Sequence, residues 1–285
     1  MKGPGMDSLV STEWLEGQLG ATGLRIIDAS WFLPADGRNG RAEYEAEHIP
    51  GAVFLDLDAV SDPDHPAPHM VPPEPLFASR MRALGLGDGQ RIMVYDNSPL
   101  HSSARAWWML KSFGARHVAI LDGGLAKWKA EGRPLESGKA EARHGHFTPV
   151  FDEEAVADKP RVTSLLGAGS HEIVDARGAA RFAGTEPEPR AGMAAGHIPG
   201  SKNLPQGTLF NQDNSIKQGD ALRAAFEEAG VDLSKPLVAT CGSGITACVL
   251  LFGAHLLGKG DVQLYDGSWA EWGADPETPK ATGVA

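Results

Sequence analysis

His48-Ile49-Pro50-Gly51 is repeated later in the chain as His197-Ile198-Pro199-Gly200. Each copy is preceded by an apolar run that leads to an aspartate followed by alanine, at residues 24–29 and again at residues 172–176. The offsets between the paired aspartates and between the paired histidines are 147 and 149 residues. The two blocks therefore keep their order, and only the lengths of the loops between them differ.

A third repeated block lies downstream of each of these pairs. Residues 121–128, with the sequence LDGGLAKW, match residues 265–272, with the sequence YDGSWAEW, at an offset of 144. Three blocks in one order at nearly one spacing indicate that the chain arose by internal duplication. The whole chain has 285 residues, so each copy is long enough to bury a core of its own.

Within each copy, short β-branched runs alternate with helical patterns. In the second copy, strands are expected at residues 173–174, 237–240 and 262–265, with an apolar helix over residues 246–257. In the first copy, strands at 91–95 and 118–121 flank a helix over 102–113. Strands that alternate with helices predict an α/β fold, in which each domain has a parallel sheet with helices on both faces. We expect a first domain over residues 7–136, a linker over 137–164 and a second domain over 165–285.

The charge balance argues against several classes of partner. The chain has 26 Lys and Arg against 37 Asp and Glu, a formal net charge of −11. Nucleic acid or an anionic membrane would require a basic face, so neither is expected as a partner. No signal peptide is recognised at the start of the chain, and two cysteines form neither a disulfide framework nor a CxxC pair. These features favour the cytoplasm.

The segment that carries the chemistry begins at Cys241, directly after the predicted strand 237–240. Cys241-Gly242-Ser243-Gly244-Ile245-Thr246 is a glycine-rich loop at the carboxyl edge of a parallel sheet, where α/β proteins bind ligands. Glycines let backbone N–H groups converge on one centre and stabilise a thiolate or a bound anion there. A buried structural cysteine is the alternative interpretation, which we accept for Cys248 because it lies inside the apolar helix. The first copy has Asp96 at the position of Cys241, so that copy has no thiol and is expected to be non-catalytic.

Together, the HIPG blocks, the DGG and DGS blocks and the cysteine loop resemble the tandem rhodanese family over nearly the whole chain. The loop CGSGITA resembles that of the branch that uses mercaptopyruvate, with Ile245 where that branch has valine. The resemblance implies two rhodanese domains and a persulfide on Cys241. It also implies 3-mercaptopyruvate as sulfur donor, release of pyruvate, and thioredoxin, small thiols or cyanide as acceptors. No metal or organic cofactor is required.

The residues of the loop also bear on other activities. Phosphatases with a related loop need an arginine at its end, where this chain has Ala247. A thiosulfate:cyanide sulfurtransferase remains an alternative, although the neutral Gly242, Ser243 and Gly244 suit a doubly charged donor poorly. A non-catalytic protein that only relays a persulfide remains a second alternative.

Further site residues are proposed around the loop. A donor carboxylate calls for arginine, and Arg181 and Arg190 follow a strand end at the same sheet edge. The resemblance implies that both hold the ketoacid, and that Asp58 and His69 of the first copy reach the loop hydroxyl of Ser243. The alternative is a solvated pair of arginines, a surface histidine and an interface aspartate. A metal site at His65 and His69 is disfavoured because prolines interrupt the spacing and no thiol joins it.

Overall fold

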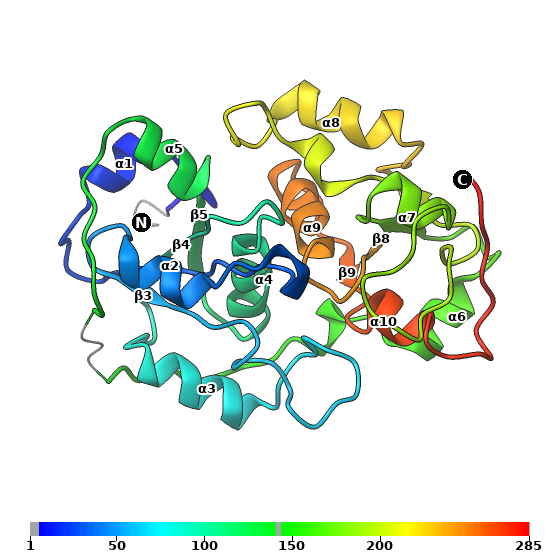
Figure 1. Cartoon of the computed structure of the whole chain (residues 1–285), viewed down its shortest axis with the longest axis horizontal. Coiled ribbons are helices and arrows are strands. Elements are labelled where there is room, and N and C mark those ends of the chain that lie inside the picture. The colour runs from blue at the N-terminus through cyan, green and yellow to red at the C-terminus, as the bar shows by residue number, and fades with distance from the viewer. Residues whose placement is uncertain (1–5, 141–143, 285) are drawn as a thin grey trace. The chain divides into compact units, whose positions relative to one another are not determined.

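A computed structural model describes residues 6–140 and 144–284, and these form two compact units (Figure 1). The first unit comprises the described residues up to Pro63, together with Pro72–Asp152 and Gln212–Ser215. The second unit comprises Asp64–Val71, Glu153–Asn211 and the described residues from Ile216 on. Each unit therefore includes a short segment whose sequence neighbours belong to the other unit.

The first unit is built on a five-stranded parallel sheet with the order β1-β5-β4-β2-β3. Its strands are β1 (Leu9–Val10), β2 (Leu24–Asp28), β3 (Ala52–Phe54), β4 (Arg91–Tyr95) and β5 (His117–Leu121). The helices are α1 (Thr12–Glu16), η1 (Pro34–Asp36), α2 (Gly40–Ala46), α3 (Glu74–Ala83), α4 (Ser103–Ser112) and α5 (Gly124–Ala130).

The second unit has a four-stranded parallel sheet with the order β7-β6-β8-β9. Its strands are β6 (Glu172–Asp175), β7 (Lys202–Asn203), β8 (Leu237–Thr240) and β9 (Val262–Leu264). The helices are η2 (Glu153–Ala155), α6 (Lys159–Leu165), α7 (Ala179–Ala183), η3 (Gln206–Leu209), α8 (Gly219–Glu228), α9 (Ala247–Leu256) and α10 (Ser268–Trp272).

The two sheets have the same topology, which confirms the predicted fold class of tandem α/β domains. The order β5-β4-β2-β3 of the first unit corresponds strand by strand to β9-β8-β6-β7 of the second. The edge strand β1, which pairs with β5, has its counterpart in a single parallel bridge between Val156 and Leu264. The range 137–164, expected as a linker, contains η2 and all of α6 except its last residue, Leu165. Its residues 141–143 lie outside the described part of the chain.

The repeated histidines have the same structural role in both units. His48 Nδ1 lies 2.7 Å from the carbonyl oxygen of Tyr44, and its ring stacks on the Tyr44 ring at 4.1 Å. His197 Nδ1 lies 2.9 Å from the carbonyl oxygen of Phe182, and its ring stacks on Phe182 at 3.7 Å. Both histidines are buried, so the HIPG blocks are packing and hydrogen-bonding elements.

The tryptophans that end the third repeated block also match. Trp128 donates its indole N–H to the carbonyl oxygen of Pro134, and Trp272 donates to that of Pro279, both at 2.8 Å. Each ring is fully buried in the core of its unit. Burial of an aromatic ring with its polar atom satisfied is strongly stabilising, which accounts for the block in both copies.

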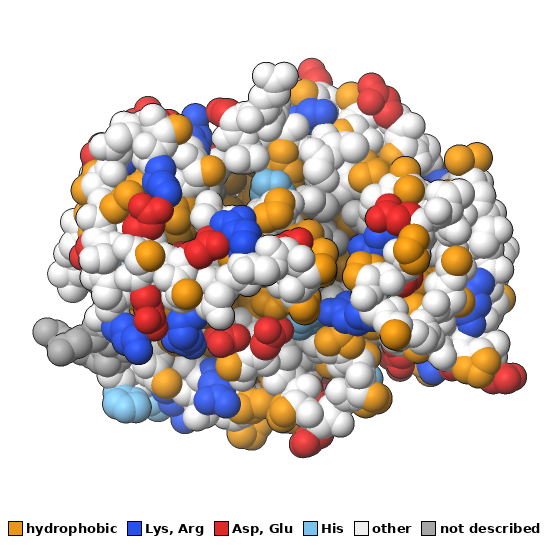
Figure 2. Space-filling model, in the orientation of Figure 1, with side chains coloured by type: hydrophobic (Ala, Val, Ile, Leu, Met, Phe, Trp, Pro, Cys, Tyr) orange, Lys and Arg blue, Asp and Glu red, His pale blue; other side chains and the backbone are white. Residues whose placement is uncertain are grey.

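On the face drawn in Figure 2, acidic and basic side chains are intermingled. Within the described ranges, no helix is long and apolar enough to cross a membrane.

The paired aspartates at the ends of β2 and β6 differ in one respect. Asp28 Oδ1 accepts the N–H of Ser30, and Asp175 Oδ1 accepts the N–H of Arg177, both at 2.9 Å. Arg177 also forms a buried ion pair with Asp175 at 2.7 Å, whereas Ser30 brings no charge to Asp28. Burial raises the pKa of Asp28 to about 6, although hydrogen bonds from Ser30 oppose the shift.

We therefore expect Asp28→Asn to stabilise the protein near neutral pH. Because the pKa of Asp28 is raised on folding, its contribution to stability is full below about pH 4 and is lost as the pH rises through about 6. The free energy of unfolding that wild type loses is on the order of 3 kcal/mol. In Asp28→Asn, the amide oxygen still accepts the Ser30 N–H. Thermal unfolding followed from pH 4 to 8 should show a decline in the wild type that the variant lacks.

The matched control is Asp175→Asn, which removes the charge that faces Arg177 and should destabilise the protein. Equal effects of the two substitutions would contradict the interpretation of Asp28.

Candidate active site

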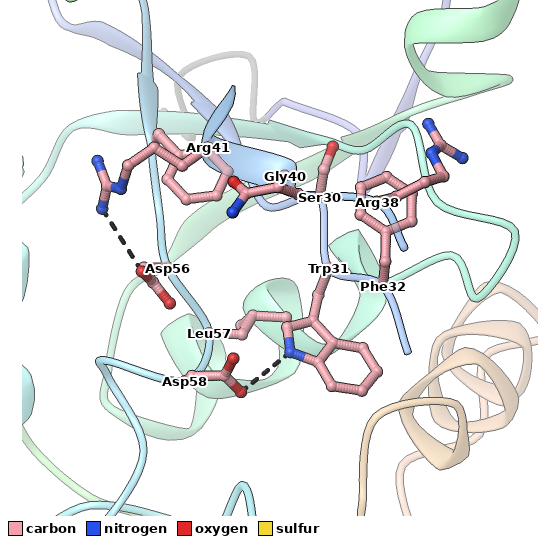
Figure 3. Close-up of a pocket in the computed structure, with 11 residues that line it drawn as sticks. Ser30, Trp31, Phe32, Arg38, Gly40, Arg41, Asp56, Leu57 and Asp58 are labelled. Atoms are coloured by element: carbon pink, nitrogen blue, oxygen red, sulfur yellow. Dashed lines mark hydrogen bonds and ion pairs between the residues drawn. The ribbon is translucent and has the colours of Figure 1, made fainter. Parts of the chain in front are cut away.

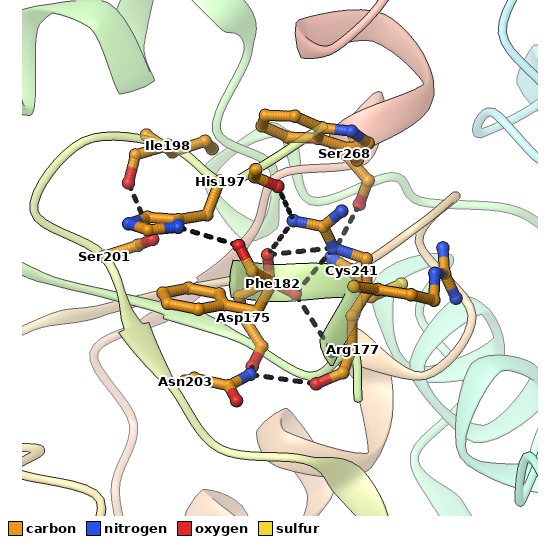
Figure 4. Close-up of polar contacts among 12 residues, drawn as sticks. Asp175, Arg177, Phe182, His197, Ile198, Ser201, Asn203, Cys241 and Ser268 are labelled. Carbon is orange, nitrogen blue, oxygen red and sulfur yellow. Dashed lines mark hydrogen bonds and ion pairs between the residues drawn. The ribbon is translucent and has the colours of Figure 1, made fainter. Parts of the chain in front are cut away.

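Cys241 lies where β8 ends, and three hydrogen bonds hold it and Gly242 to the start of α10. The Cys241 N–H donates to Ser268 Oγ at 3.2 Å (Figure 4). The Cys241 carbonyl accepts the N–H of Trp269, and the Gly242 carbonyl accepts that of Ala270, both at 2.9 Å. Only 2% of the Cys241 surface is exposed, so this thiol is enclosed by the loop and its neighbours.

The rest of the loop is suited to hold an anion. Among the described residues, none accepts a hydrogen bond from the backbone N–H of Gly242, Ser243, Ile245 or Thr246. Gly244 has a φ of +80°, a conformation that favours glycine. Unpaired amides that precede the helix α9 are the ordinary means of binding negative charge in α/β proteins.

Cys248 has a different environment from Cys241. It lies in the first turn of α9, is fully buried, and directs its Sγ to the Gly244 carbonyl at 3.2 Å. This contact helps to shape the loop, in agreement with the structural role expected for Cys248.

Arg181 lies against the cysteine loop and is held by a buried carboxylate. A Cβ atom placed on Gly242 would lie 3.2 Å from Arg181 Nη2, so the guanidinium contacts the loop backbone. Glu188 accepts from Nε of Arg181 at 3.2 Å and from Nη2 at 2.5 Å. The Glu188 side chain is only 4% exposed. Its two bonds leave Nη1 of Arg181 without a partner in the part of the chain that the structure describes.

Glu188 also accepts from Arg177 at 2.7 Å. Arg177 pairs in turn with Asp175, as Figure 4 shows. The Arg177 guanidinium lies 4.5 Å from the centre of the Trp269 ring. Burial opposes the charge of Arg177, yet Asp175 and then Glu188 raise its pKa. The chain of charges from Asp175 to Arg181 thus holds the arginine next to the loop. Arg177 thus has a structural role beside Asp175.

Sequence reasoning missed Glu188. The run Glu186-Pro187-Glu188-Pro189-Arg190 indicates a solvated loop, and nothing in it distinguishes the buried glutamate from the exposed one. Arg190 follows on the same loop and is half-buried.

His69 and Ser243 are brought together within the second unit. His69 Nδ1 lies 2.9 Å from Ser243 Oγ, and both residues are buried. The contact forms because segment Asp64–Val71 belongs to the second unit, although it lies in the first copy of the sequence. His69 has a φ of +64°, which is uncommon for a residue with a side chain and costs about 1–3 kcal/mol.

Asp58 belongs to the first unit, so the expected pair of Asp58 with His69 stays a prediction. Its Oδ1 accepts the indole N–H of Trp31 at 2.9 Å (Figure 3). Both side chains line a pocket of about 230 Å³ at the carboxyl ends of β2 and β3. Arg41 also lines this pocket, and its Nη2 lies 3.5 Å from Asp56 Oδ2 (Figure 3).

The first copy carries Asp96 where the second carries Cys241. Its carboxylate accepts the N–H of Ser98 and that of Ser103, each at 2.8 Å, and so caps the start of α4. The Asp96 carbonyl accepts the N–H of Leu125 at 2.9 Å, as the Cys241 carbonyl accepts that of Trp269. The backbone of the loop is therefore retained in the first copy, while the Asp96 side chain has a structural role.

No group of three or more His, Cys, Asp or Glu side chains that could hold a metal ion occurs in residues 6–140 and 144–284.

Comparison with known proteins places this geometry in a family. A family model for the rhodanese-like domain matches residues 11–131 and 159–275. Human 3-mercaptopyruvate sulfurtransferase is 44% identical over 271 residues, which cover 93% of this chain and 91% of the human protein. Thiosulfate sulfurtransferase of Cricetulus griseus is 41% identical over 286 residues, or 97% of this chain and 96% of that protein.

A solved structure agrees with the sequence comparisons. The crystal structure of SseA from Escherichia coli, described as a 3-mercaptopyruvate sulfotransferase with the rhodanese fold, matches with a TM-score of 0.85 at 41% identity. The match covers 93% of this chain and 99% of SseA. The two successive matches to the family model span most of the sequence, so the chain belongs to the rhodanese-like domain family, as a tandem member related to the 3-mercaptopyruvate sulfurtransferases.

Proposed function

We propose that this protein is a sulfurtransferase that takes sulfur from 3-mercaptopyruvate and carries it as a persulfide on Cys241. The observation that carries the proposal is the enclosed thiol of Cys241 at the start of a loop with unpaired amides, with Arg181 against that loop. A thiol donor with a carboxylate matches this combination of nucleophile and guanidinium.

The reaction is a displacement at sulfur. The Cys241 thiolate attacks the sulfur of the donor thiol, a sulfur–sulfur bond forms, and the carbon–sulfur bond breaks with its electron pair left on carbon. The resulting enolate takes up the proton that the donor thiol loses, and pyruvate leaves. The amides of Gly242, Ser243, Ile245 and Thr246 stabilise the persulfide anion until an acceptor removes its outer sulfur.

The neutral loop favours mercaptopyruvate over thiosulfate. Relatives named for either donor are similarly close to this chain, at 44% and 41% identity, so overall similarity does not separate the two activities. Gly242, Ser243 and Gly244 bring no positive charge to the reacting sulfur, where thiosulfate is doubly charged. Arg181 and Arg190 instead serve a carboxylate that lies away from that sulfur.

A proton relay completes the proposed site. Ser243, polarised by His69, passes the proton of the donor thiol to the departing enolate, and Asp58 orients His69. The 2.9 Å distance between His69 Nδ1 and Ser243 Oγ supports the first of these two contacts. Such acid–base assistance contributes about 10²–10⁴-fold to a rate.

The acceptor, the domain roles and the location are part of the same proposal. Thioredoxin or a small thiol removes the sulfur, residues 165–285 form the catalytic domain, and residues 7–136 form the non-catalytic one. Two free cysteines favour the cytoplasm.

The central test compares donors and cysteines. Wild type should release sulfide from 3-mercaptopyruvate with a higher kcat/KM than from thiosulfate, with one reductant throughout. Cys241→Ser should be inactive with both donors, while Cys248→Ser should retain most activity. Intact mass after donor treatment should show one added sulfur atom in wild type and in Cys248→Ser only. Turnover by Cys241→Ser would contradict the mechanism, and a preference for thiosulfate would contradict the donor assignment.

Lysine substitutions test the arginines. Arg181→Lys and Arg190→Lys should each lower kcat/KM for mercaptopyruvate, since an ammonium cannot reproduce the planar fork. The loss of one charge-assisted hydrogen bond costs about 1.5–3 kcal/mol, or roughly ten- to more than a hundredfold. Arg223→Lys, on the exposed face of α8, is the control and should leave the kinetics unchanged. Unchanged kinetics in both test variants would show that other groups hold the carboxylate.

Alanine substitutions at Ser243 and His69 test the relay. Both should reduce mercaptopyruvate turnover far more than any residual thiosulfate turnover, because thiosulfate has no thiol proton to move. The measurement is the ratio of kcat values for the two donors in each variant. An equal loss with both donors would mean that the substitutions only distort the loop.

A further inference from the structure

Two hydrogen bonds connect segment Asp64–Val71 to the rest of the second unit. His69 Nδ1 lies 2.9 Å from Ser243 Oγ, and the backbone N–H of Val71 donates to Asp266 Oδ2 at 2.6 Å. Asp266 lies between β9 and α10 and is 1% exposed. The two attachments join residues that are 174 and 195 positions apart in the sequence.

The second attachment lies next to a strained residue. His69 has a φ of +64°, and Val71 follows two residues later. A backbone N–H that donates to a carboxylate forms a short, charge-assisted hydrogen bond, stronger than one between neutral groups. The bond to Asp266 therefore opposes relaxation of His69 to an ordinary backbone conformation, which would move its ring.

The position of Asp266 links this segment to the cysteine loop. Two residues after Asp266, Ser268 accepts the N–H of Cys241, and Trp269 then donates to the Cys241 carbonyl. Residues 266–269 thus bind both the backbone of Cys241 and the segment that carries His69.

We propose that Asp266 is a positioning residue for His69: by accepting the Val71 N–H, it holds segment Asp64–Val71 so that the imidazole stays on Ser243. This inference rests on the proposed function, because it assigns a task to the histidine of the proposed relay. Asp266 is 1% exposed, and it acts through the backbone of Val71 and the ring of His69.

Two pairs of variants test the proposal. Asp266→Ala removes the acceptor, whereas Asp266→Asn keeps an oxygen that accepts the same N–H. Val71→Pro removes the donor without altering Asp266, whereas Val71→Ala keeps it. We expect the first member of each pair to lower kcat for mercaptopyruvate about 10- to 100-fold, with KM within a few-fold and thiosulfate turnover retained. Val71→Ala should be near wild type, and Asp266→Asn should lose clearly less activity than Asp266→Ala because it keeps a neutral acceptor.

Two further readouts separate positioning from a general loss of structure. Hydrogen–deuterium exchange of the peptide over residues 64–71 should be faster in Asp266→Ala than in wild type, with the core strands unchanged. In the His69→Ala background, Asp266→Ala should cause little further loss, because the group it positions is already absent. Asp122→Ala, the equivalent change in the first copy, is the matched control and should leave the donor ratio unchanged.

Full additivity of Asp266→Ala and His69→Ala, or an equal loss of both donor activities, would overturn the proposal. So would unchanged exchange and kinetics in both Asp266→Ala and Val71→Pro. Failure of the proposed function is a separate result, since wild type would then form no persulfide on Cys241 from mercaptopyruvate.

Discussion

The first turn of α10 is the element on which the site depends. Its residues accept the N–H of Cys241 and donate to the carbonyls of Cys241 and Gly242. These bonds fix the backbone where β8 turns toward α9. Because they use main-chain atoms of Cys241 and Gly242, the amides of Gly242, Ser243, Ile245 and Thr246 stay available for chemistry. The repeated block at residues 265–272 is thus explained by a hydrogen-bonding task as well as by its buried tryptophans.

Duplication reproduces this arrangement in the first unit without the thiol. There Asp96 receives the corresponding backbone bond from Leu125, at the corresponding distance of 2.9 Å. A cysteine at this position would lack the acceptor groups with which Asp96 caps α4. The first copy therefore keeps the backbone of the loop for folding, while the second uses the same backbone to present a nucleophile.

The two copies also differ in their buried charged residues. In the second unit, Asp175, Arg177, Glu188 and Arg181 form a chain in which each charge faces an opposite one. Buried ions are tolerated only when they are paired and hydrogen-bonded, and this chain satisfies both conditions up to the end that lies on the cysteine loop. Among the described residues of the first unit, Ser30 stands where Arg177 stands in the second, so no cation opposes the effect of burial, which raises the pKa of Asp28 to about 6.

The sequence by itself determined the duplication, the parallel α/β class and the place of Cys241 at a sheet edge. These follow from local patterns: alternation of strand and helix, a strand that ends before a glycine-rich loop, and blocks repeated at nearly constant spacing. Tertiary structure alone decided that Glu188 is buried under two arginines and that Val71 is bound by Asp266. The contact of His69 with Ser243 was expected from the family resemblance, but no local pattern in the sequence indicates it. The physical reason is that burial of a charge and a hydrogen bond between residues nearly 200 positions apart depend on how distant segments pack, which leaves no periodicity in the sequence.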